Sequence, residues 1–458
     1  MFQPQIFKAY DIRGIYGQDL DDQFAFDLGL AYVSFRRQEA DLAGKELKDI
    51  SIVVGSDMRL SSPILKENLI AGLVAAGVKV IDIGLVSTPT FYFAVANYGH
   101  QGGIMVSASH NPSEWNGFKV VRSRALPISG TSGLETLKEL ISSGNLSPAT
   151  EPGQIILQND ILNDELEYDL GLVDWQKIKP LKIVADAANS MGAQYLEVLF
   201  NRLPGELIKL NFDLDGTFPV HEADPLKEEN VNLLRQQVVA EQADLGITTD
   251  GDGDRVFFVD NEGQLISPAL VRGLLAKLFL LDNPGAKIGY DVRPGKITTD
   301  LIAEQGGQAI PTKVGHSLIK EQMIKDGIYF AGESSGHFFL NTEIGCFEMP
   351  MLMIAKMLLV FSQSGQSASD YLRQYKKYFS SGEINSEVAD KEVIFARLRE
   401  KYNDGEINDL DGLSISYPNF WFNVRGSNTE NKIRLNLEAN DAATMAAKRD
   451  EVLALIRT

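Results

Sequence analysis

The sequence predicts an α/β protein: three related α/β domains with mixed sheets, followed by a C-terminal α+β domain. The main observation is a weak internal repeat, in which an apolar strand ends in Asp and is followed by a helix-length segment and a second strand. Strands that alternate with helices are typical of βαβ units. With 458 residues, the chain is also too long for a single hydrophobic core.

The repeat occurs three times, and its first strands end at Asp57-Met58-Arg59, at Asp186 and at Asp291-Val292-Arg293. The expected strand pairs span residues 51–59 and 78–83, 181–186 and 207–211, and 287–293 and 308–313. Three such units indicate three related domains. The tail differs, because strands at 414–417 and 433–437 precede a helix that begins at Ala442, and this order predicts an α+β domain.

Turn-rich stretches at 142–153, 260–263 and 361–378 are candidate boundaries between the domains. We therefore expect α/β domains over residues 1–150, 151–260 and 261–372, and the α+β domain over residues 373–458.

Composition and charge limit the classes of partner. Hydrophobic residues make up 44% and charged residues 23% of the chain, which is typical of a soluble globular protein. The net charge of −19 disfavours nucleic acid and anionic membrane surfaces, because both bind basic patches. A phosphorylated substrate would need specific Arg and Lys side chains that create a positive pocket within an acidic protein.

Targeting and redox features point to a reducing compartment. Cys346 is the single cysteine, which excludes an internal disulfide and a cysteine-based zinc site and favours a role in core packing. The N-terminal stretch lacks a basic start followed by an apolar run, and the longest apolar stretch, 349–361, contains Lys356 and is too short to span a bilayer. We expect no signal peptide, no membrane span and a cytoplasmic location.

The stretch Ser107-Ala108-Ser109-His110-Asn111-Pro112 follows an apolar run that predicts a short buried strand. Pro112 fixes its own φ and restricts the residue before it, which favours a turn. Ser109 is therefore expected on a tight loop at a strand end, where its hydroxyl is presented to a cleft beside His110. An ordinary Ser/Asn/Pro turn is the alternative interpretation.

Asp250-Gly251-Asp252-Gly253-Asp254-Arg255 offers three carboxylates at alternate positions, which can fold around a hard cation such as Mg²⁺. The two glycines allow the backbone to turn tightly enough for the carboxylates to converge. An EF-hand loop does not fit, because Arg255 replaces its glycine and Asn261 replaces its final glutamate. The alternative is a solvated acidic turn, although clustered carboxylates without a cation would repel one another.

Three further segments suit a sugar phosphate. Gly332–His337 is a glycine-flanked loop whose Glu and Ser provide acceptors and donors for sugar hydroxyls. Arg425–Glu430 lies between two tail strands and offers a guanidinium, hydroxyls and an amide to a phosphate dianion. A polar hairpin is the alternative interpretation of this loop. Lys313–Ser317 places His316 at the end of an expected strand.

Taken in order, these loops resemble those of the α-D-phosphohexomutase superfamily, and most closely its bacterial phosphomannomutase/phosphoglucomutase branch. The resemblance covers the whole chain, with a phosphoserine loop, a metal loop, a sugar loop and a phosphate loop in the first to fourth domains. It implies a heart-shaped fold with the active site in a central cleft. The chain departs from the family pattern at Ser107, where Thr is frequent, at Arg293, where Lys is frequent, and at Asn431, where Pro is usual.

The resemblance implies reversible phosphoryl transfer between O1 and O6 of a hexose, mannose or glucose. Ser109 would carry the phosphate, and a hexose 1,6-bisphosphate would be the intermediate and an activator. Mg²⁺ would be held by Asp250, Asp252 and Asp254 and would contact Ser109. The other catalytic residues implied are Arg13, His110, Lys119, Arg255 and His316, the last as a candidate acid–base. The substrate contacts implied are Arg293, Glu333, Ser335, His337, Arg425, Ser427, Asn428 and Thr429.

Three other functions remain open at this point: a phosphoglucosamine mutase, a sugar phosphatase that uses the same phosphoserine with water as final acceptor, and a non-enzymatic sugar-phosphate sensor. The sensor is disfavoured, because binding alone needs neither a nucleophile nor a metal. The expected partners are small sugar phosphates, with no nucleic acid and no membrane, and the expected oligomeric state is a monomer.

Overall fold

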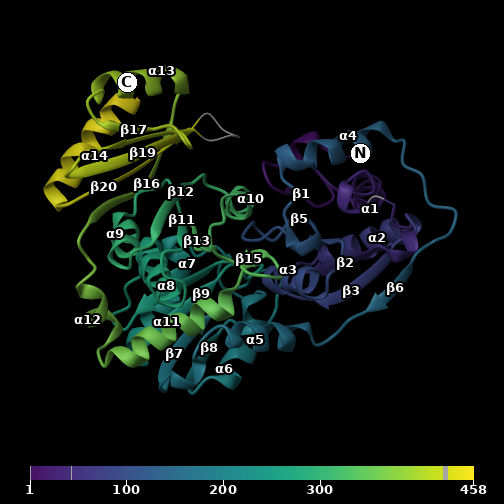
Figure 1. The fold of residues 1–458 in the computed structure, drawn as a ribbon, viewed down its shortest axis with the longest axis horizontal. Coiled ribbons are helices and arrows are strands. Elements are labelled where there is room, and N and C mark those ends of the chain that lie inside the picture. Colours follow the sequence, from purple (N-terminus) through teal and green to yellow (C-terminus); the bar gives the residue numbers. More distant parts are fainter. Residues whose placement is uncertain (1, 43, 427–431, 458) are drawn as a thin grey trace. The chain divides into compact units, whose positions relative to one another are not determined.

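The structure, a computed structural model, describes residues 2–42, 44–426 and 432–457 (Figure 1). The chain forms two compact units. The first unit comprises Met1–Ile266, His316–Asp326 and Ser335–Tyr371, and the second comprises Ser267–Gly315, Gly327–Ser334 and Leu372–Thr458.

The first sheet lies in the first unit and has the strand order β1-β5-β4-β2-β3-β6. Its strands are β1 (Ile12–Ile15), β2 (Ser51–Ser56), β3 (Lys79–Leu85), β4 (Gly102–Val106), β5 (Trp115–Arg122) and β6 (Gln154–Leu157). β2, β3, β4 and β6 pair in parallel, whereas β1 and β5 are antiparallel, so the sheet is mixed as predicted. The strand expected before Ser107 is β4, and every residue of it is buried.

Four helices belong to this part of the chain: α1 (Asp22–Arg36), α2 (Ser62–Ala75), α3 (Thr88–Asn97) and α4 (Leu134–Ser143). The side chain of Asp21 caps α1 by accepting the N–H of Phe24, and Ser87 caps α3 in the same way. α1 and α2 lie very close together at Gly72. A Cβ at this position would stand 2.1 Å from the carbonyl oxygen of Phe26, so only glycine fits there.

The second sheet of the first unit has the order β10-β9-β7-β8. Its strands are β7 (Leu181–Asp186), β8 (Gly205–Leu210), β9 (Leu245–Thr249) and β10 (Val256–Asp260), and its helices are α5 (Ile161–Gly171), α6 (Gly192–Arg202) and α7 (Glu228–Ala240). β7 is parallel to β8 and β9, whereas β10 returns antiparallel to β9. The aspartate motif therefore forms the connection between two fully buried strands.

The first unit also contains α10 (His316–Asp326), the antiparallel pair β14 (Phe338–Asn341) and β15 (Cys346–Glu348), and α11 (Pro350–Ser364). The apolar stretch at 349–361 is thus mostly a buried helix. Short 3₁₀ helices occur at Pro4–Ile6, Ala40–Leu42, Leu47–Asp49, Ser123–Ala125, Gly130–Ser132 and Trp175–Lys177.

The second unit begins with α8 (Pro268–Asp282), β11 (Lys287–Asp291), α9 (Lys296–Glu304), β12 (Gln308–Thr312) and β13 (Phe330–Gly332). β11 lies between β12 and β13 and is parallel to both. This is the third occurrence of the repeat, and β12 ends one residue before the predicted end of its strand. α12 (Ala368–Arg373) precedes the tail.

The tail of the second unit is an antiparallel sheet of order β16-β20-β19-β18-β17. Its strands are β16 (Phe379–Glu387), β17 (Glu406–Asn408), β18 (Leu413–Ser416), β19 (Phe420–Gly426) and β20 (Lys432–Ala439). The helices α13 (Lys391–Lys401) and α14 (Ala442–Arg457) share one hydrophobic core with this sheet, and α14 packs along β16 and β20 (Figure 1). The α+β tail is therefore confirmed.

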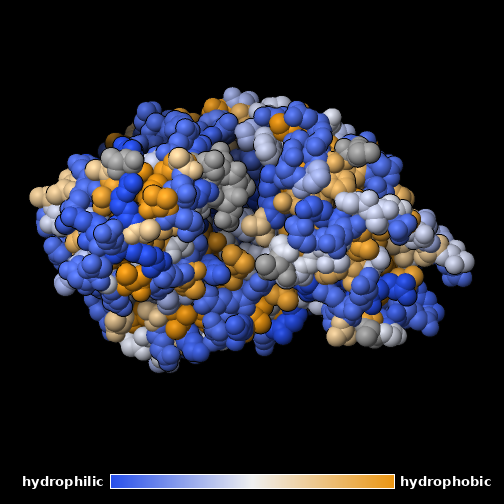
Figure 2. Space-filling view, turned by 90° about the horizontal axis from the view of Figure 1, so that it is seen from above, coloured by the Kyte–Doolittle hydropathy of each residue, from blue (hydrophilic) through white to orange (hydrophobic). Residues whose placement is uncertain are grey.

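Hydrophilic residues predominate on the face shown in Figure 2, where hydrophobic residues form scattered patches. Within the described part of the chain, no helix is both long and apolar enough to cross a membrane. Cys346 is buried and its Sγ lies 3.7 Å from Sδ of Met323, which confirms the predicted packing role. Burial raises the pKa of this thiol to about 12.

Two carboxyl groups are buried four residues apart on α5, away from the predicted motifs. Thr90 Oγ1 donates to Glu165 Oε2 at 2.6 Å, and the N–H of Leu352 donates to Asp169 Oδ2 at 3.1 Å. Burial raises the pKa of Glu165 to about 8, and burial together with the charge of Glu165 raises the pKa of Asp169 well above its usual value. The folded protein therefore holds protons here that the unfolded chain releases.

Glu165→Gln is expected to make the protein more stable at pH 8, with the gain shrinking toward pH 5. Between the ordinary pKa of 4.5 and the raised value of about 8, the native state binds the extra proton, so stability falls as pH rises. The slope is at most about 1.4 kcal/mol per pH unit and per proton. The thermal midpoint measured from pH 5 to 8 checks this. Glu167→Gln, at an exposed site on the same helix, is the control, and parallel pH curves for the two variants and wild type would contradict the assignment.

Candidate active site

The serine loop, residues 107–112, leaves the buried end of β4 and turns back on itself. The N–H of Asn111 donates to the carbonyl oxygen of Ala108 at 3.1 Å, and Ser109 adopts a left-handed φ of 52°. The expectation that Ser109 is presented openly to a cleft is wrong, because Ser109 is only 1% exposed. The aspartate loop, residues 250–255, lies directly against it: a Cβ at Gly251 would stand 2.3 Å from the carbonyl oxygen of Ser109.

The Ser109 hydroxyl lies among charged groups from both loops. Its Oγ donates to Asp250 Oδ2 at 3.0 Å and lies 3.3 Å from Nδ1 of His110. Arg255 Nη2 is 2.9 Å from the same Nδ1, and Arg255 Nε is 3.4 Å from Asp250 Oδ2. Burial and the positive charges of Arg255 and Arg13 hold the pKa of His110 well below its usual value. Neutral His110 therefore accepts a hydrogen bond from Arg255 through Nδ1.

The three aspartates of the aspartate loop converge as predicted. Asp250, Asp252 and Asp254 are buried, and one carboxylate oxygen of each lies within 4.8 Å of the others. Asp252 Oδ1 is buried and accepts no hydrogen bond from the described residues. An all-oxygen donor set with an unsatisfied carboxylate oxygen fits Mg²⁺. Burial, together with the charges of Asp254 and Asp252, raises the pKa of Asp250 to about 8.

Lys119 offsets much of the repulsion between these carboxylates. Its Nζ lies 2.7 Å from Asp252 Oδ2 and 2.5 Å from Asp254 Oδ2. Burial opposes the charge of Lys119, but the two carboxylates raise its pKa well above its usual value. Clustered aspartates do not imply a cation by repulsion alone here, because a buried ammonium already neutralises part of their charge. The argument that carboxylate repulsion requires a metal ion is therefore wrong. The assignment of a Mg²⁺ site depends instead on the set of carboxylate oxygens.

Arg13 reaches the serine loop from β1. Its Nη1 donates to Asn111 Oδ1 at 2.8 Å and to the carbonyl oxygen of Ala108 at 3.3 Å, and its Nε donates to Asp11 at 2.7 Å. β1 pairs with β5, the strand that carries Lys119, so adjacent strands of one sheet supply both cations.

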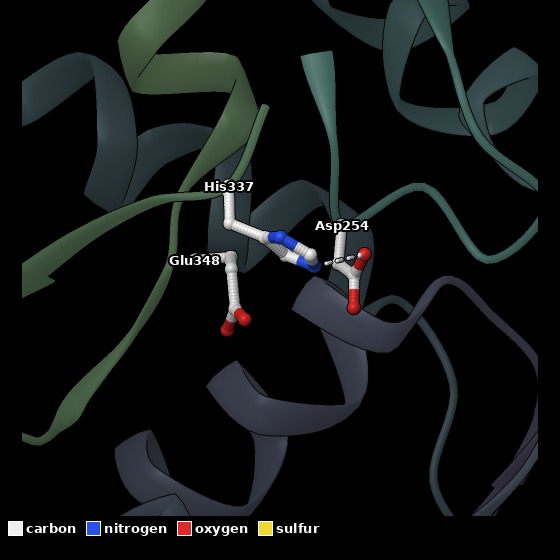
Figure 3. A group of neighbouring side chains, drawn as sticks. All are labelled: Asp254, His337 and Glu348. Carbon is white, nitrogen blue, oxygen red and sulfur yellow. Dashed lines mark ion pairs between the residues drawn. The ribbon is translucent and has the colours of Figure 1, made fainter. Parts of the chain in front are cut away.

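His337 contacts the aspartate loop at Asp254. Its Nε2 is 3.1 Å from Asp254 Oδ1, and its Nδ1 is 3.0 Å from Oγ of Ser335. Figure 3 shows the ring directed toward Asp254, with the carboxylate of Glu348 nearby. One possible ligand atom from each of Asp254, His337 and Glu348 also lies within 4.8 Å of the other two, as in a metal site. However, Nζ of Lys320 lies 3.0 Å from Glu348 Oε2, so an ammonium already pairs with this carboxylate.

His316 is the first residue of α10 rather than the end of a strand, which corrects the prediction for Lys313–Ser317. Its ring centroid lies 5.8 Å from that of His337 and 5.1 Å from that of Tyr10. Burial and the charges of Lys320 and Lys119 hold the pKa of His316 well below its usual value. Its Nε2 is buried and makes no hydrogen bond to the described residues, so this nitrogen can accept a proton.

The second unit brings together two of the predicted sugar contacts. Arg293 Nε donates to Asp291 Oδ2 at 2.7 Å, and Arg293 Nη2 is 3.4 Å from Glu333 Oε1. The N–H of Gly315 donates to the same Glu333 oxygen at 2.9 Å. Glu333 is only 3% exposed, so its orientation is set by these neighbours.

Arg425 is the predicted phosphate ligand of the tail, and it lies near the end of β19. Its guanidinium is 3.8 Å from Asp411 Oδ2 and 4.0 Å from Glu383 Oε2, both at the long end of ion-pair distances. The other three predicted residues of this loop, Ser427, Asn428 and Thr429, lie outside the described residues.

Thr88 is a contact that the sequence reasoning missed. Its Oγ1 donates to Asp252 Oδ2 at 2.6 Å, and its N–H donates to the Asp252 carbonyl oxygen at 2.9 Å. Ser87-Thr88-Pro89 marks a helix start in the sequence. No spacing rule links that start to an aspartate 164 positions later. Glu348 and Lys320 were missed for the same reason, since neither lies in a recognisable motif.

Four family models match the chain in order. They are domains I, II and III of the alpha/beta/alpha type and the C-terminal domain of phosphoglucomutase/phosphomannomutase, at residues 4–145, 164–263, 270–378 and 383–455. The chain therefore belongs to the phosphoglucomutase/phosphomannomutase family, the phosphohexomutase isomerases. The predicted fold class, three related α/β domains and an α+β tail, is confirmed.

Full-length relatives agree with this membership. A phosphomannomutase from Escherichia coli is 38% identical over 100% of both chains. A phosphomannomutase from Methanocaldococcus jannaschii is 37% identical over 98% of this chain and 97% of its own. Among solved structures, a phosphoglucomutase/phosphomannomutase family protein from Burkholderia thailandensis matches with a TM-score of 0.89 and 32% identity, covering 99% of this chain and 97% of that one.

Proposed function

We propose that the protein is a Mg²⁺-dependent phosphohexomutase that interconverts hexose 1-phosphates and hexose 6-phosphates of mannose, glucose or both. The observation that carries this proposal is the hydroxyl of Ser109, which lies 3.0 Å from Asp250 at the edge of a buried carboxylate triad. A nucleophile beside a hard-cation site is the arrangement that phosphoryl transfer requires.

Ser109 carries the phosphate in the resting enzyme and gives it to the free hydroxyl of the bound sugar phosphate. The sugar oxygen forms its bond to phosphorus as the bond from phosphorus to Ser109 Oγ breaks. The hydroxyl proton passes to a base, and the departing Oγ takes up a proton to become the Ser109 hydroxyl. This gives a hexose 1,6-bisphosphate. Turned end for end, the bisphosphate returns its other phosphate to Ser109, and the isomeric monophosphate leaves.

The charged residues of the first unit support this chemistry. Mg²⁺ held by Asp250, Asp252 and Asp254 supplies electrostatic stabilisation of the transferring phosphoryl group. Arg13, Lys119 and Arg255 add positive charge around the same group. Arg255 also keeps neutral His110 in place beside Ser109 through the 2.9 Å contact described above.

His316 is the proposed acid–base. The low pKa of His316 keeps the ring neutral at pH 7, and its buried Nε2 has no hydrogen-bond partner among the described residues. We propose that Nε2 accepts the proton of the sugar hydroxyl and later returns it. His337 and Ser335 would contact the sugar.

From the second unit, Arg293 and Glu333 would bind sugar hydroxyls, and Arg425, Ser427, Asn428 and Thr429 would bind the phosphate that is not transferred. Added hexose 1,6-bisphosphate would act as an activator by phosphorylating Ser109. We expect the enzyme to act as a monomer in the cytoplasm.

A substrate panel tests the proposal. The protein is incubated with Mg²⁺ and, in turn, mannose 1-phosphate, glucose 1-phosphate and glucosamine 1-phosphate, and the products are followed by ³¹P NMR. Conversion of the mannose or glucose ester to the 6-phosphate is the expected result. Turnover of glucosamine 1-phosphate alone would favour a phosphoglucosamine mutase. Release of inorganic phosphate would identify a phosphatase, and no turnover would leave a sensor.

Arg425→Ala is expected to raise KM by roughly 10- to 100-fold, the value of one or two lost charge-assisted hydrogen bonds to phosphate. Both carboxylates near Arg425 stand at 3.8 Å or more, so the guanidinium is well suited to turn toward a phosphate. Leakage of bisphosphate should accompany the change, and added glucose 1,6-bisphosphate should partly restore the rate.

Arg399→Ala is the control for Arg425→Ala, because Arg399 pairs with Asp409 at an exposed site of the same tail. Phosphorylation of Ser109 should survive in both variants. An unchanged KM without release of bisphosphate would mean that Arg425 belongs to a polar hairpin only.

A further inference from the structure

Arg59 is a buried guanidinium that holds the serine loop by its backbone. It follows β2, at the end of the first expected strand of the first repeat, and is 0% exposed. Its Nη1 donates to the carbonyl oxygens of Pro112 at 2.6 Å and Trp115 at 3.0 Å. Its Nη2 donates to those of Ser109 at 2.7 Å and Asn111 at 2.6 Å. One side chain thus fixes four carbonyl groups around the nucleophile.

Asp57 orients Arg59 and also reaches the other side of Ser109. Asp57 Oδ2 is 3.3 Å from Arg59 Nε, and Asp57 Oδ1 accepts the N–H of Arg59 at 3.1 Å and the hydroxyl of Ser62 at 2.5 Å. Ser107 is a further hydrogen-bond partner of this carboxylate. Ser107 Oγ in turn accepts the N–H of Ser109 at 2.9 Å.

The Ser109 backbone is therefore held at both ends. Its N–H bonds to Ser107, which bonds to Asp57, and its carbonyl oxygen bonds to Arg59. Ser109 needs such support, because its φ of 52° is a left-handed conformation that costs a non-glycine residue energy. Such a conformation persists only where the surrounding contacts over-determine it.

The third repeat uses the same pair for a similar purpose. β11 ends at Asp291 and is followed by Arg293, just as Asp57 and Arg59 follow β2. Asp291 accepts the N–H of Ser334 at 2.9 Å and its hydroxyl at 2.8 Å, in the loop after β13. β13 is the parallel neighbour of β11, as β4 is of β2. In both cases an Asp-x-Arg at one strand end organises the loop that follows the neighbouring strand.

We propose that Arg59, oriented by Asp57, is a positioning residue that sets the direction in which the Ser109 side chain leaves its loop. This inference rests on the proposed function, because it assigns Arg59 a part in the transfer of phosphate to and from Ser109. Apart from its ion pair with Asp57, the Arg59 guanidinium donates its hydrogen bonds to backbone carbonyl groups between Ser109 and Trp115. Its loss should therefore lower the rate of phosphoryl transfer and leave substrate affinity nearly unchanged.

The test uses Arg59→Lys and Arg59→Ala in the full chain, with kcat and KM measured on glucose 1-phosphate. Single-turnover transfer from phosphorylated enzyme is measured alongside. A lysine can donate to some of the four carbonyls but cannot reproduce the planar fork. We expect kcat and the transfer rate to fall about 100-fold for Arg59→Ala, since small misplacement of a reacting atom costs that much. In Arg59→Lys, kcat and the transfer rate should fall less, and in both variants KM should stay within about threefold of the wild-type value.

Two measurements separate positioning from general destabilisation. Guanidinium ion added to Arg59→Ala should restore part of the transfer rate. The matched control is Arg36→Ala: Arg36 is 1% exposed in the same unit, and it pairs with Asp41 and donates to the carbonyl oxygen of Gln101. Arg36→Ala should lower the thermal midpoint without changing the transfer rate of the folded fraction.

Unchanged kcat in both Arg59 variants would overturn the inference, as would a loss that only follows the fraction of unfolded protein. If Arg59→Ala does not fold, Arg59→Lys provides the test: a lower kcat with nearly unchanged KM supports the inference, and an unchanged kcat overturns it. Wild-type enzyme that carries no phosphate on Ser109 and shows no transfer would contradict the proposed function itself, which is a separate outcome.

Discussion

Ser109→Ala is expected to abolish mutase turnover, with a loss of at least about 10⁴-fold in kcat. The reason is covalent: the proposed reaction needs the Ser109 hydroxyl to carry the phosphate before its transfer to the sugar and to take a phosphate back after the bisphosphate has turned, and a methyl group can do neither. Ser109 Oγ lies 3.0 Å from Asp250 Oδ2, whereas the carboxylates of the aspartate loop pair with Lys119 and Arg255. The substitution of Ser109 by alanine also leaves the backbone hydrogen bonds of the loop in place, so the protein should still fold.

Intact-mass spectrometry should find one phosphate on the wild-type chain and none on Ser109→Ala, and peptide mapping should place it on Ser109. Ser113→Ala is the matched control, since Ser113 is the next serine along the chain and directly follows the same loop. An active alanine variant, or a phosphate mapped to another residue, would contradict the role of Ser109.

Asp252→Asn is expected to lower the affinity for Mg²⁺ by at least about 100-fold, and turnover with it. Asp252 supplies a triad carboxylate whose Oδ1 is buried with no hydrogen bond from the described residues. Chelation of wild-type protein should likewise stop turnover, and added Mg²⁺ should restore it. Isothermal titration of both proteins with Mg²⁺ measures the affinity independently of the reaction.

The same variant should also make the metal-free protein less stable. The sequence alone suggests the opposite, because removing one of three clustered carboxylates relieves repulsion. In the structure, however, Asp252 pairs with buried Lys119 at 2.7 Å, so its neutralisation leaves Lys119 with Asp254 alone. We expect a loss of roughly 1–3 kcal/mol. Asp260→Asn, at the buried last residue of β10, is the control and should leave Mg²⁺ affinity unchanged.

The parts of the fold that the sequence predicts are those with a local cause. The strands at 181–186 and 287–291 and the closing helix from Ala442 follow from apolar periodicity and from turn residues next to them. The loops also follow, because Pro112 and Gly253 restrict or free the backbone at known positions. The burial of Ser109 is not predictable in this way, because the aspartate loop that covers it lies about 140 residues later in the sequence.

The residues of the candidate site also fall into two groups: those predictable from local sequence and those that depend on contacts between distant segments. The three aspartates occupy alternate positions of one short segment, so their convergence is predictable from spacing. Lys119 reaches them because β5 pairs with β4, and Thr88 reaches Asp252 because α3 begins beside the aspartate loop. Such contacts depend on sheet order and helix placement, which no single segment encodes. His316 shows a related limit, since the strand expected over 308–313 did not reveal that a helix starts at His316.

The burial of Cys346 has a practical consequence. As the only cysteine of the chain, with burial raising the pKa of its thiol to about 12, it carries almost no thiolate at neutral pH. A cysteine introduced at an exposed position, such as Ser143→Cys on α4, would then be the sole thiol that reacts with a maleimide. A fluorophore or a spin label can therefore be attached at one chosen position of either unit without first removing Cys346.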